Sequence, residues 1–379
     1  MTVRRFAPQY DDPVSAPVCL IVNPSAGGGK AGRVAPGVER TLREYGLRVR
    51  RVDTRDLPHA RELAEDGARA GETVVALSGD GMIGVVADVL QDFPGAVLGV
   101  LPGGRGNDLA RVLGIPRDPL AACAVIAHGI PRAMDLGEVG GATEVGKRAE
   151  AASVKVGQTH APDHPRAQDA HTKLRGQAFV GIASVGFDSV ANRIANQAPA
   201  WLGNLVYAYG ALRALASWRP ARFEIELDPP GERLSFTAYT VGACNSKTYG
   251  GGMRAAPGAM LDDGLLEVVV LENIGKLAFL TKILPKVFKG THVQLSSVYV
   301  FRAAEVEISA DRPFAMYADG DPIGELPVRV RAVRGAVTVL VPADASTLDS
   351  AFSSPPFPSP AAADAAAPIA ESTAPSTDR

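Results

Sequence analysis

The chain has 379 residues, of which 46% are hydrophobic, 21% are charged and 6% are aromatic, and its formal net charge is −2. This length fits two domains, and the near-neutral charge with few aromatic residues does not indicate nucleic-acid binding. The three cysteines lack CxxC spacing, and no apolar run is long enough to span a bilayer, so a zinc site, a disulfide framework and a membrane-spanning segment are not expected.

The first half alternates apolar runs with helical patterns. Buried strands are predicted at 18–22, 73–77 and 96–101, a half-exposed strand at 47–52, and helices at 34–46, 59–70 and 83–90. Each buried strand ends in a glycine-rich turn. The recurring order of strand, glycine turn and helix predicts a parallel α/β sheet.

The second half is richer in strands. Apolar runs interrupted by helical segments at about 199–218 and 275–289 predict a β-sandwich-like domain. The expected parts are a flexible leader at 1–15, a nucleotide-binding α/β domain at 16–138, a flexible insertion at 139–177, a β-rich domain at 178–350 and a disordered Ala/Pro-rich tail at 351–379. A return of the last strands to the first domain is left open.

The three glycine-rich turns are the first signal of function. They are NPSAGGGK from Asn23, SGDGM from Ser78 and PGGRGND from Pro102. Glycines let backbone N–H groups approach an anion closely, and the carboxyl ends of parallel strands lie on the edge of a sheet where ligands bind. The first turn lacks the spacing of a Walker A loop, so the turns alone predict only a phosphate site.

These turns resemble the NPxSGxGK, GGDGT and PxGTxNDFAR motifs of the diacylglycerol kinase catalytic-domain family, which includes bacterial lipid kinases, sphingosine kinases and ceramide kinases. The resemblance continues in the second half. ASVGFD from Ala183, GGGMR from Gly250, DGLLEV from Asp263 and DGD from Asp319 are similar to the family's GxGFDA, GGGM, DGxLDV and DGE segments. The motifs keep the family's order from residue 22 to about 324, which makes the resemblance specific.

The resemblance implies an ATP-dependent lipid kinase that phosphorylates a hydroxyl of diacylglycerol or a related lipid. It implies an α/β nucleotide-binding domain of the NAD kinase and diacylglycerol kinase type, followed by a β-sandwich-like domain. The ATP-binding residues that it implies are Asn23, Pro24, Ser25, Ala26, Gly27, Thr54, Ser78, Gly79, Asp80, Gly81, Met82, Gly104, Arg105, Asn107 and Asp108.

The resemblance also implies the catalytic and metal-binding residues. The late DGE segment carries the general base in the family, which implies Asp319 or Asp321, whereas sphingosine kinases give this role to the residue matching Asp80. A Mg²⁺ site is implied at Asp263, with the carbonyl groups of Met260 and Leu265.

Four departures from the family motifs involve five positions. Met82 replaces a threonine, Gly84-Val85 replaces Asn-Glu, Arg105 replaces a threonine and Asp321 replaces a glutamate. Met82 removes a hydroxyl contact to phosphate, whereas Arg105 can clamp a phosphate through two N–H groups. Two alternatives therefore stay open: an NAD kinase-like enzyme, and a nucleotide- or lipid-binding regulator with weakened catalysis.

The expected partner is a lipid substrate presented at a membrane surface. No apolar segment follows the basic N-terminal residues, so a cytoplasmic location is expected, with peripheral contact at the inner membrane face. The segment 275–290 combines lysines with apolar residues, which fits either an interfacial surface or an amphipathic helix packed on its own sheet. Pro285 is expected to kink or end this helix. A homodimer is left open.

Overall fold

The computed structural model describes residues 17–141, 176–197, 205–343 and 351–353. The predicted leader lies outside these residues, as does the predicted insertion except at its ends. Within the described ranges, no helix is both long enough and apolar enough to cross a membrane.

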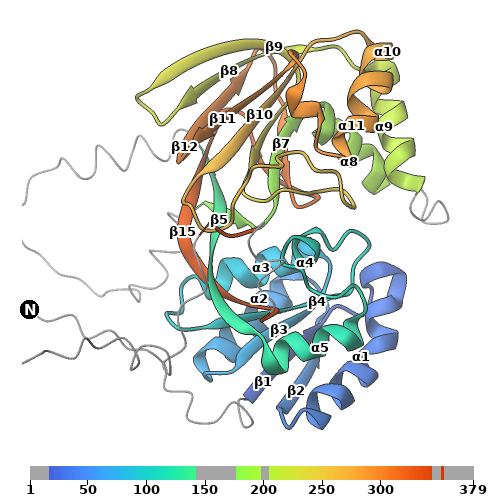
Figure 1. The fold of residues 1–379 in the computed structure, drawn as a ribbon, viewed down its shortest axis with the longest axis vertical. Helices are drawn as coiled ribbons and strands as arrows, with labels where there is room; N and C mark the ends of the chain where they lie inside the picture. The colour runs from blue at the N-terminus through green and yellow to red at the C-terminus, as the bar shows by residue number, and fades with distance from the viewer. Residues whose placement is uncertain (1–16, 142–175, 198–204, 344–350, 354–379) are drawn as a thin grey trace, which may run out of the picture.

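The N-terminal lobe is a parallel sheet between two layers of helices (Figure 1). Its strands are β1 (Pro17–Val22), β2 (Arg48–Asp53), β3 (Thr73–Ser78) and β4 (Val97–Pro102), in the order β4-β3-β1-β2. Its helices are α1 (Ala26–Glu44), α2 (Leu57–Arg69), α3 (Asp80–Leu90), α4 (Asp108–Val112) and α5 (Pro119–His128). The chain reverses direction across the sheet after β2, so right-handed crossovers place α1 and α2 on opposite faces. The predicted α/β fold is confirmed for this lobe.

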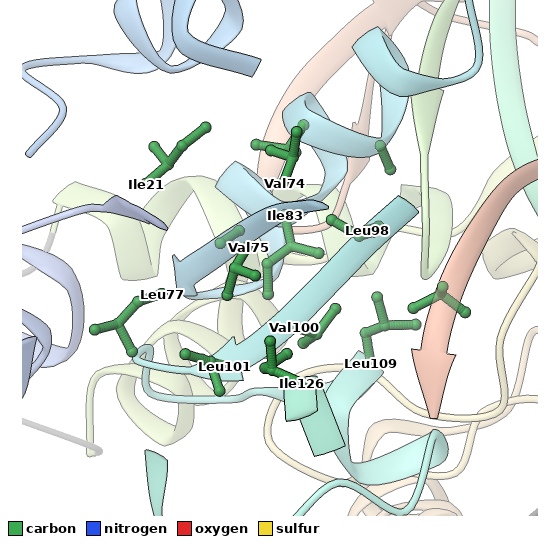
Figure 2. Packing of buried hydrophobic residues seen from close by; sticks show 14 of the residues in the cluster. Ile21, Val74, Val75, Leu77, Ile83, Leu98, Val100, Leu101, Leu109 and Ile126 are labelled. Carbon is green, nitrogen blue, oxygen red and sulfur yellow. The ribbon is translucent and has the colours of Figure 1, made fainter. Parts of the chain in front are cut away.

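Burial explains why the three inner strands have no polar face. β1, β3 and β4 are covered on both sides, so nearly every residue in them is buried, and Figure 2 shows Ile21, Val75 and Leu98 in one cluster with Ile126 of α5. β2 is the edge strand and alternates between exposed and half-buried residues. A continuous apolar run therefore indicates a central strand of the sheet, and a mixed run indicates an edge strand.

The C-terminal lobe is an antiparallel sheet with helices on one side (Figure 1). Its strands are β6 (Gln177–Phe179), β7 (Ile182–Gly186), β8 (Ala221–Leu227), β9 (Glu232–Cys244), β10 (Leu266–Glu272), β11 (Val298–Ala303), β12 (Glu305–Ala310), β13 (Ala315–Ala318) and β14 (Asp321–Glu325). Its helices are α8 (Phe187–Gln197), α9 (Leu205–Ser217), α10 (Lys276–Ala278), the π-helix η3 (Phe279–Ile283), α11 (Leu284–Val287) and the 3₁₀ helix η4 (His292–Gln294).

One sequence prediction for this lobe is wrong. The apolar run at 298–309 predicts one strand, but the structure has two, because β11 pairs with β10 whereas β12 pairs with β8 and β15. From the sequence, Pro285 is expected to kink or end its helix. The helix does not end there, because it continues to Val287, but it is irregular directly before the proline. Proline has no N–H to donate to the preceding turn, and that turn widens into a π-helix.

A two-stranded ribbon joins the lobes. β5 (Ile130–Gly141) pairs antiparallel with β15 (Val328–Val341) along most of its length, and β15 also pairs with β4 at one end and with β12 at the other. The register shifts near Gly335, whose N–H donates a 2.6 Å hydrogen bond to Asp135 Oδ1. The last strand therefore belongs to both lobes.

The described residues after position 350 pack against the rest of the chain. Ala351 and Phe352 are buried, the Leu261 N–H donates to the Ala351 carbonyl at 2.9 Å, and the Arg132 guanidinium lies 4.6 Å from the centre of the Phe352 ring. The tail boundary predicted at 351 is therefore wrong for these residues, because Phe352 supplies apolar surface that its Ala, Pro and Ser neighbours lack.

Candidate functional site

The three glycine-rich turns meet at the carboxyl edge of the parallel sheet, and glycine is required where their backbones touch. A Cβ on Gly104 would lie 2.4 Å from the Gly79 Cα, and a Cβ on Gly27 would lie 2.6 Å from the Gly103 carbonyl oxygen. Both distances are shorter than any real contact of a Cβ atom. The turns therefore form one packed floor.

The first turn ends β1 and leads into α1. The Asn23 side chain accepts hydrogen bonds from the Ser25 N–H at 3.1 Å and from the Ser25 hydroxyl at 2.8 Å. Gly27, Gly28 and Gly29 follow with φ angles of 60°, 69° and 83°, so regular helix begins only after them. Backbone N–H groups at the start of a helix favour an anion.

Asp80 connects the second turn to the third. Its carboxylate accepts hydrogen bonds from the Asp108 N–H at 2.9 Å and from the Leu109 N–H at 3.0 Å, and so caps the start of α4. Burial raises the pKa of Asp80, the neighbouring Asp108 carboxylate raises it further, and the two N–H bonds oppose the shift. Since both oxygens are engaged, Asp80 holds the third turn in place.

The third turn is fixed by its own side chains and by the other lobe. Asn107 has a φ of 50° and accepts a 2.7 Å hydrogen bond from the Gly104 N–H. The Asp108 carboxylate pairs with Arg111 and accepts a 2.8 Å hydrogen bond from the Gly251 N–H. The GGGMR segment of the second half therefore lies directly against this turn.

Asp319 lies in the turn between β13 and β14 and is buried and anchored. Its carboxylate accepts hydrogen bonds from the N–H groups of Val180, at 2.8 Å, and Gly181, at 2.9 Å. Burial raises the pKa of Asp319 to about 7, and the negative charge of Asp80 adds to this shift, whereas the N–H bonds oppose it. These bonds fix the turn that carries Asp321.

Asp321 begins β14 and faces the cavity. Among the described residues its carboxylate has no hydrogen-bond or ion-pair partner, and desolvation by the surrounding protein raises the pKa of this group. A Cβ on Gly81 would lie 2.9 Å from Asp321 Oδ2, and a Cβ on Gly84 would lie 3.2 Å from Asp319 Oδ2. Gly84, a departure from the family motif, thus makes room for the acidic turn.

A cavity of about 450 Å³ lies between the lobes over these groups. Its lining includes most of the residues that the resemblance assigned to ATP and catalysis: Asn23, Ser25, Ala26, Gly27, Ser78, Gly79, Asp80, Gly81, Met82, Gly104, Arg105, Asp108, Asp319 and Asp321. Pro24, Thr54 and Asn107 are not in the lining. The Thr54 hydroxyl donates to the Asp56 carbonyl oxygen at 2.7 Å.

The two substituted phosphate positions differ in exposure. Met82 is buried in the first turn of α3, where its thioether offers no strong donor. Arg105 is exposed at the cavity and has no ion-pair partner among the described residues. A free guanidinium beside glycine N–H groups suits a phosphate oxygen.

The implied metal residues do not line this cavity. The Asp263 carboxylate accepts a 3.0 Å hydrogen bond from the Leu265 N–H and pairs with Arg302. Oxygen donors of this kind suit Mg²⁺, but here the arginine occupies the carboxylate. The Mg²⁺ site implied at Asp263, Met260 and Leu265 therefore stays a prediction, and an ion bound there would have to displace Arg302 from the carboxylate.

A second, mostly apolar cavity of about 140 Å³ adjoins the first. The two share Ile182, Ser184, Tyr249 and Gly250, and the second is walled by β7, β9 and β10 and by residues 279–287. Asp188 also lines it and accepts hydrogen bonds from the Tyr249 hydroxyl at 3.1 Å and the Thr240 hydroxyl at 3.2 Å. Burial raises the pKa of Asp188.

Sequence reasoning missed the groups that act through their backbone. The N–H groups of Val180 and Gly181 bind Asp319, and the N–H group of Gly251 binds Asp108. Almost every residue type has a backbone N–H group, so the sequence does not show which ones make such bonds. Gly84 departs from the family motif, and an isolated glycine inside a helical pattern is a signal of close packing that could have indicated its contact with the acidic turn.

The comparisons with known proteins cover both lobes. Residues 17–139 match the diacylglycerol kinase catalytic domain, and residues 181–341 match the YegS C-terminal NAD kinase beta sandwich-like domain. The structure of a putative diacylglycerol kinase from Bacillus anthracis matches with a TM-score of 0.63 at 20% identity, over 86% of this chain and 97% of its own. This likeness shows that the two chains share a fold.

Curated relatives are similar along most of the chain. A diacylglycerol kinase of Mycobacterium tuberculosis is 31% identical over 86% of this chain and 95% of its own length. A probable YegS-like lipid kinase of Pseudomonas fluorescens is 30% identical over 77% of this chain and 85% of its own length. The chain therefore belongs to the family of bacterial diacylglycerol kinases and YegS-like lipid kinases.

Proposed function

We propose that the protein is a lipid kinase that transfers the γ-phosphoryl group of ATP to a hydroxyl of diacylglycerol or a related lipid. The observation that carries the proposal is the junction of two cavities. One is lined by glycine turns, Arg105 and Asp321, and the other is mostly apolar. A phosphate donor and a long-chain acceptor thus have adjoining places.

In the proposed reaction, the acceptor hydroxyl oxygen attacks the γ-phosphorus. A new O–P bond forms while the bond to the β–γ bridging oxygen breaks, and ADP leaves. Asp321 accepts the hydroxyl proton, because its carboxylate faces the cavity without a protein partner. Asp319 acts as a positioning residue that holds the turn of Asp321 through Val180 and Gly181.

The nucleotide is expected to arrive as Mg-ATP, and the ion supplies charge neutralisation on the phosphates when it is bound. Arg105 and the N–H groups of the three turns are expected to stabilise the negative charge of the same phosphates. The second cavity is proposed to hold an acyl chain. Its apolar walls oppose the alternative of an NAD kinase-like enzyme, whose acceptor is polar.

The test is transfer of radiolabelled phosphate from ATP to diacylglycerol, sphingosine, ceramide or NAD, with the lipids held in neutral mixed micelles. Asp321→Asn is expected to lower kcat by about a hundredfold or more, because general-base catalysis contributes at least this much. Asp92→Asn, in the turn that follows α3 and away from both cavities, serves as a matched control and is expected to keep full activity.

Two outcomes would count against the proposal. Full activity in Asp321→Asn would remove the assigned base and return the role to Asp319 or Asp80. No transfer to any lipid, with ATP binding intact, would favour the alternative of a regulator with weakened catalysis.

A further inference from the structure

The most exposed large apolar side chains among the described residues lie in one helical segment of the C-terminal lobe. Leu277 is 74% exposed and Phe288 is 53% exposed, whereas every other exposed large apolar residue in the described part of the chain is at most 40% exposed. Leu277 lies in the first turn of the continuous helix formed by α10, η3 and α11, and Phe288 directly follows its last residue. At 1.5 Å per residue, they are roughly 16 Å apart along its axis.

The inner face of the same segment is packed against the C-terminal lobe. Phe279, Ile283 and Val287 recur at every fourth position, are buried, and line the mostly apolar cavity together with Leu284. Phe279 also packs against the aromatic rings of Phe187 and Tyr239. Packing of the helix on its own lobe therefore accounts for this face and leaves Leu277 and Phe288 unexplained.

Lysines surround the exposed apolar residues. Lys282, Lys286 and Lys289 are exposed, and no carboxylate of the described residues forms an ion pair with them. Lys276 donates a 2.8 Å hydrogen bond to the Ala216 carbonyl oxygen. No Asp or Glu occurs between Glu272 and Glu305, although the whole chain has a net charge of −2. The positive charge is therefore concentrated in this segment, and no acidic residue of the same segment balances it.

We propose that this outer face, made of Lys276, Leu277, Lys282, Lys286, Phe288 and Lys289, docks the protein on an anionic lipid bilayer. Basic residues interleaved with exposed leucine and phenylalanine match a surface that offers negative headgroups above apolar chains. A protein partner would also cover apolar side chains, but the absence of any acid over this stretch favours the uniformly negative bilayer. The proposal rests on the proposed function, because the helix that lies on the bilayer is also a wall of the acyl-chain cavity.

The test is co-sedimentation of the full chain with vesicles of phosphatidylcholine alone and with 30 mol% phosphatidylglycerol. Binding is expected to require the anionic lipid and to weaken strongly in 0.5 M salt, because screening shortens the range of charge interactions. Lys282→Gln with Lys286→Gln is expected to lower the partition coefficient about 25-fold, at roughly fivefold per lysine.

Leu277→Ser with Phe288→Ser is expected to lower the partition coefficient by at least about tenfold, because both side chains lose their burial in the bilayer. The control carries Leu120→Ser with Arg117→Gln, exposed residues of the N-terminal lobe, and is expected to bind as the wild type does. The changed side chains are exposed, so thermal unfolding of the variants is expected to be unchanged.

Activity in neutral mixed micelles separates this inference from the proposed function. Weakened vesicle binding with unchanged micelle activity in the lysine variant is the expected result. A wild-type protein that phosphorylates lipid in micelles but ignores anionic vesicles, or variants that bind them as well as wild type, would overturn the docking face and leave the kinase proposal standing. Binding without any transfer to lipid would overturn the kinase proposal and leave the docking face standing.

Discussion

Gly84 of α3 and Asp319 of the C-terminal lobe lie so close that a Cβ at position 84 would come within 3.2 Å of Asp319 Oδ2. The acidic turn thus rests on the helix that begins with Asp80, and the two lobes share one site. The Asn that the family usually has near this position would enter the space of the Asp319 carboxylate. The departure at Gly84 is therefore matched to the position of Asp319 and is no sign of lost catalysis by itself.

Asp319 is expected to make stability depend on pH. Its pKa is raised from 3.8 to about 7, so between these values the folded protein holds a proton that the unfolded chain has released. This contribution is complete below the unfolded pKa and is lost as pH rises through about 7. Between pH 5.5 and 8, the free energy of unfolding of the wild type is expected to fall by about 2 kcal/mol more than that of Asp319→Asn. Urea unfolding at both pH values measures this, and equal falls would contradict it.

The packed floor of the site predicts a steric effect at Gly104. Gly104→Ala places a Cβ against the Gly79 backbone, so the second and third turns must separate, and ATP affinity is expected to fall at least about tenfold because the N–H groups lose their alignment. Gly140→Ala is the control, since a Cβ there meets nothing within 4 Å. Isothermal titration with ATP measures both variants. Unchanged affinity in Gly104→Ala would mean that the turns do not bind phosphate.

Arg105 is predicted to bind a phosphate of ATP. Arg105→Ala is expected to raise the KM for ATP about tenfold or more, because a hydrogen bond to a charged group contributes roughly 1.5–3 kcal/mol. Arg105→Lys keeps the charge but loses the planar pair of N–H groups and is expected to recover only part of the effect. Steady-state kinetics at varied ATP distinguish these cases. Equal KM values for all three proteins would place Arg105 outside the phosphate contacts.

The apolar cavity is predicted to select acceptors by chain length. Gly242 lines it, and a Cβ at this position meets only ordinary contacts, the nearest being Cys244 Sγ at 3.5 Å. Gly242→Leu therefore fills the cavity without forcing the backbone apart. The KM for long-chain diacylglycerol is expected to rise about tenfold, at roughly 0.8 kcal/mol for each methylene displaced, while the KM for ATP stays the same. A variant that treats short and long acceptors as the wild type does would place the acyl chain elsewhere.

The sequence predicted what depends on patterns along the chain. The buried runs that became β1, β3 and β4 are apolar because both faces of the sheet are covered, and the glycine turns after them are visible as motifs. These two features, together with the resemblance, were enough to place Asp80 and Asp321 in one cavity.

What depends on contacts between distant backbones was not predictable. The break between β11 and β12 reflects the different strands beside each, and the bonds from Val180 and Gly181 to Asp319 involve main-chain groups that every residue has. The resemblance could supply the residue types at Asp263, but it could not show that Arg302 occupies its carboxylate.

The ribbon of β5 and β15 limits how the two cavities can move relative to each other. β15 is hydrogen-bonded into the N-terminal sheet through β4 and into the C-terminal sheet through β12, so the lobes cannot separate as free bodies on a loose linker. Motion between the lobes therefore has to bend this ribbon, and its irregular point near Gly335 is held by the hydrogen bond to Asp135. We therefore expect a substitution at Asp135 to loosen the alignment of the two lobes, and with it the proposed phosphoryl transfer, from outside both cavities.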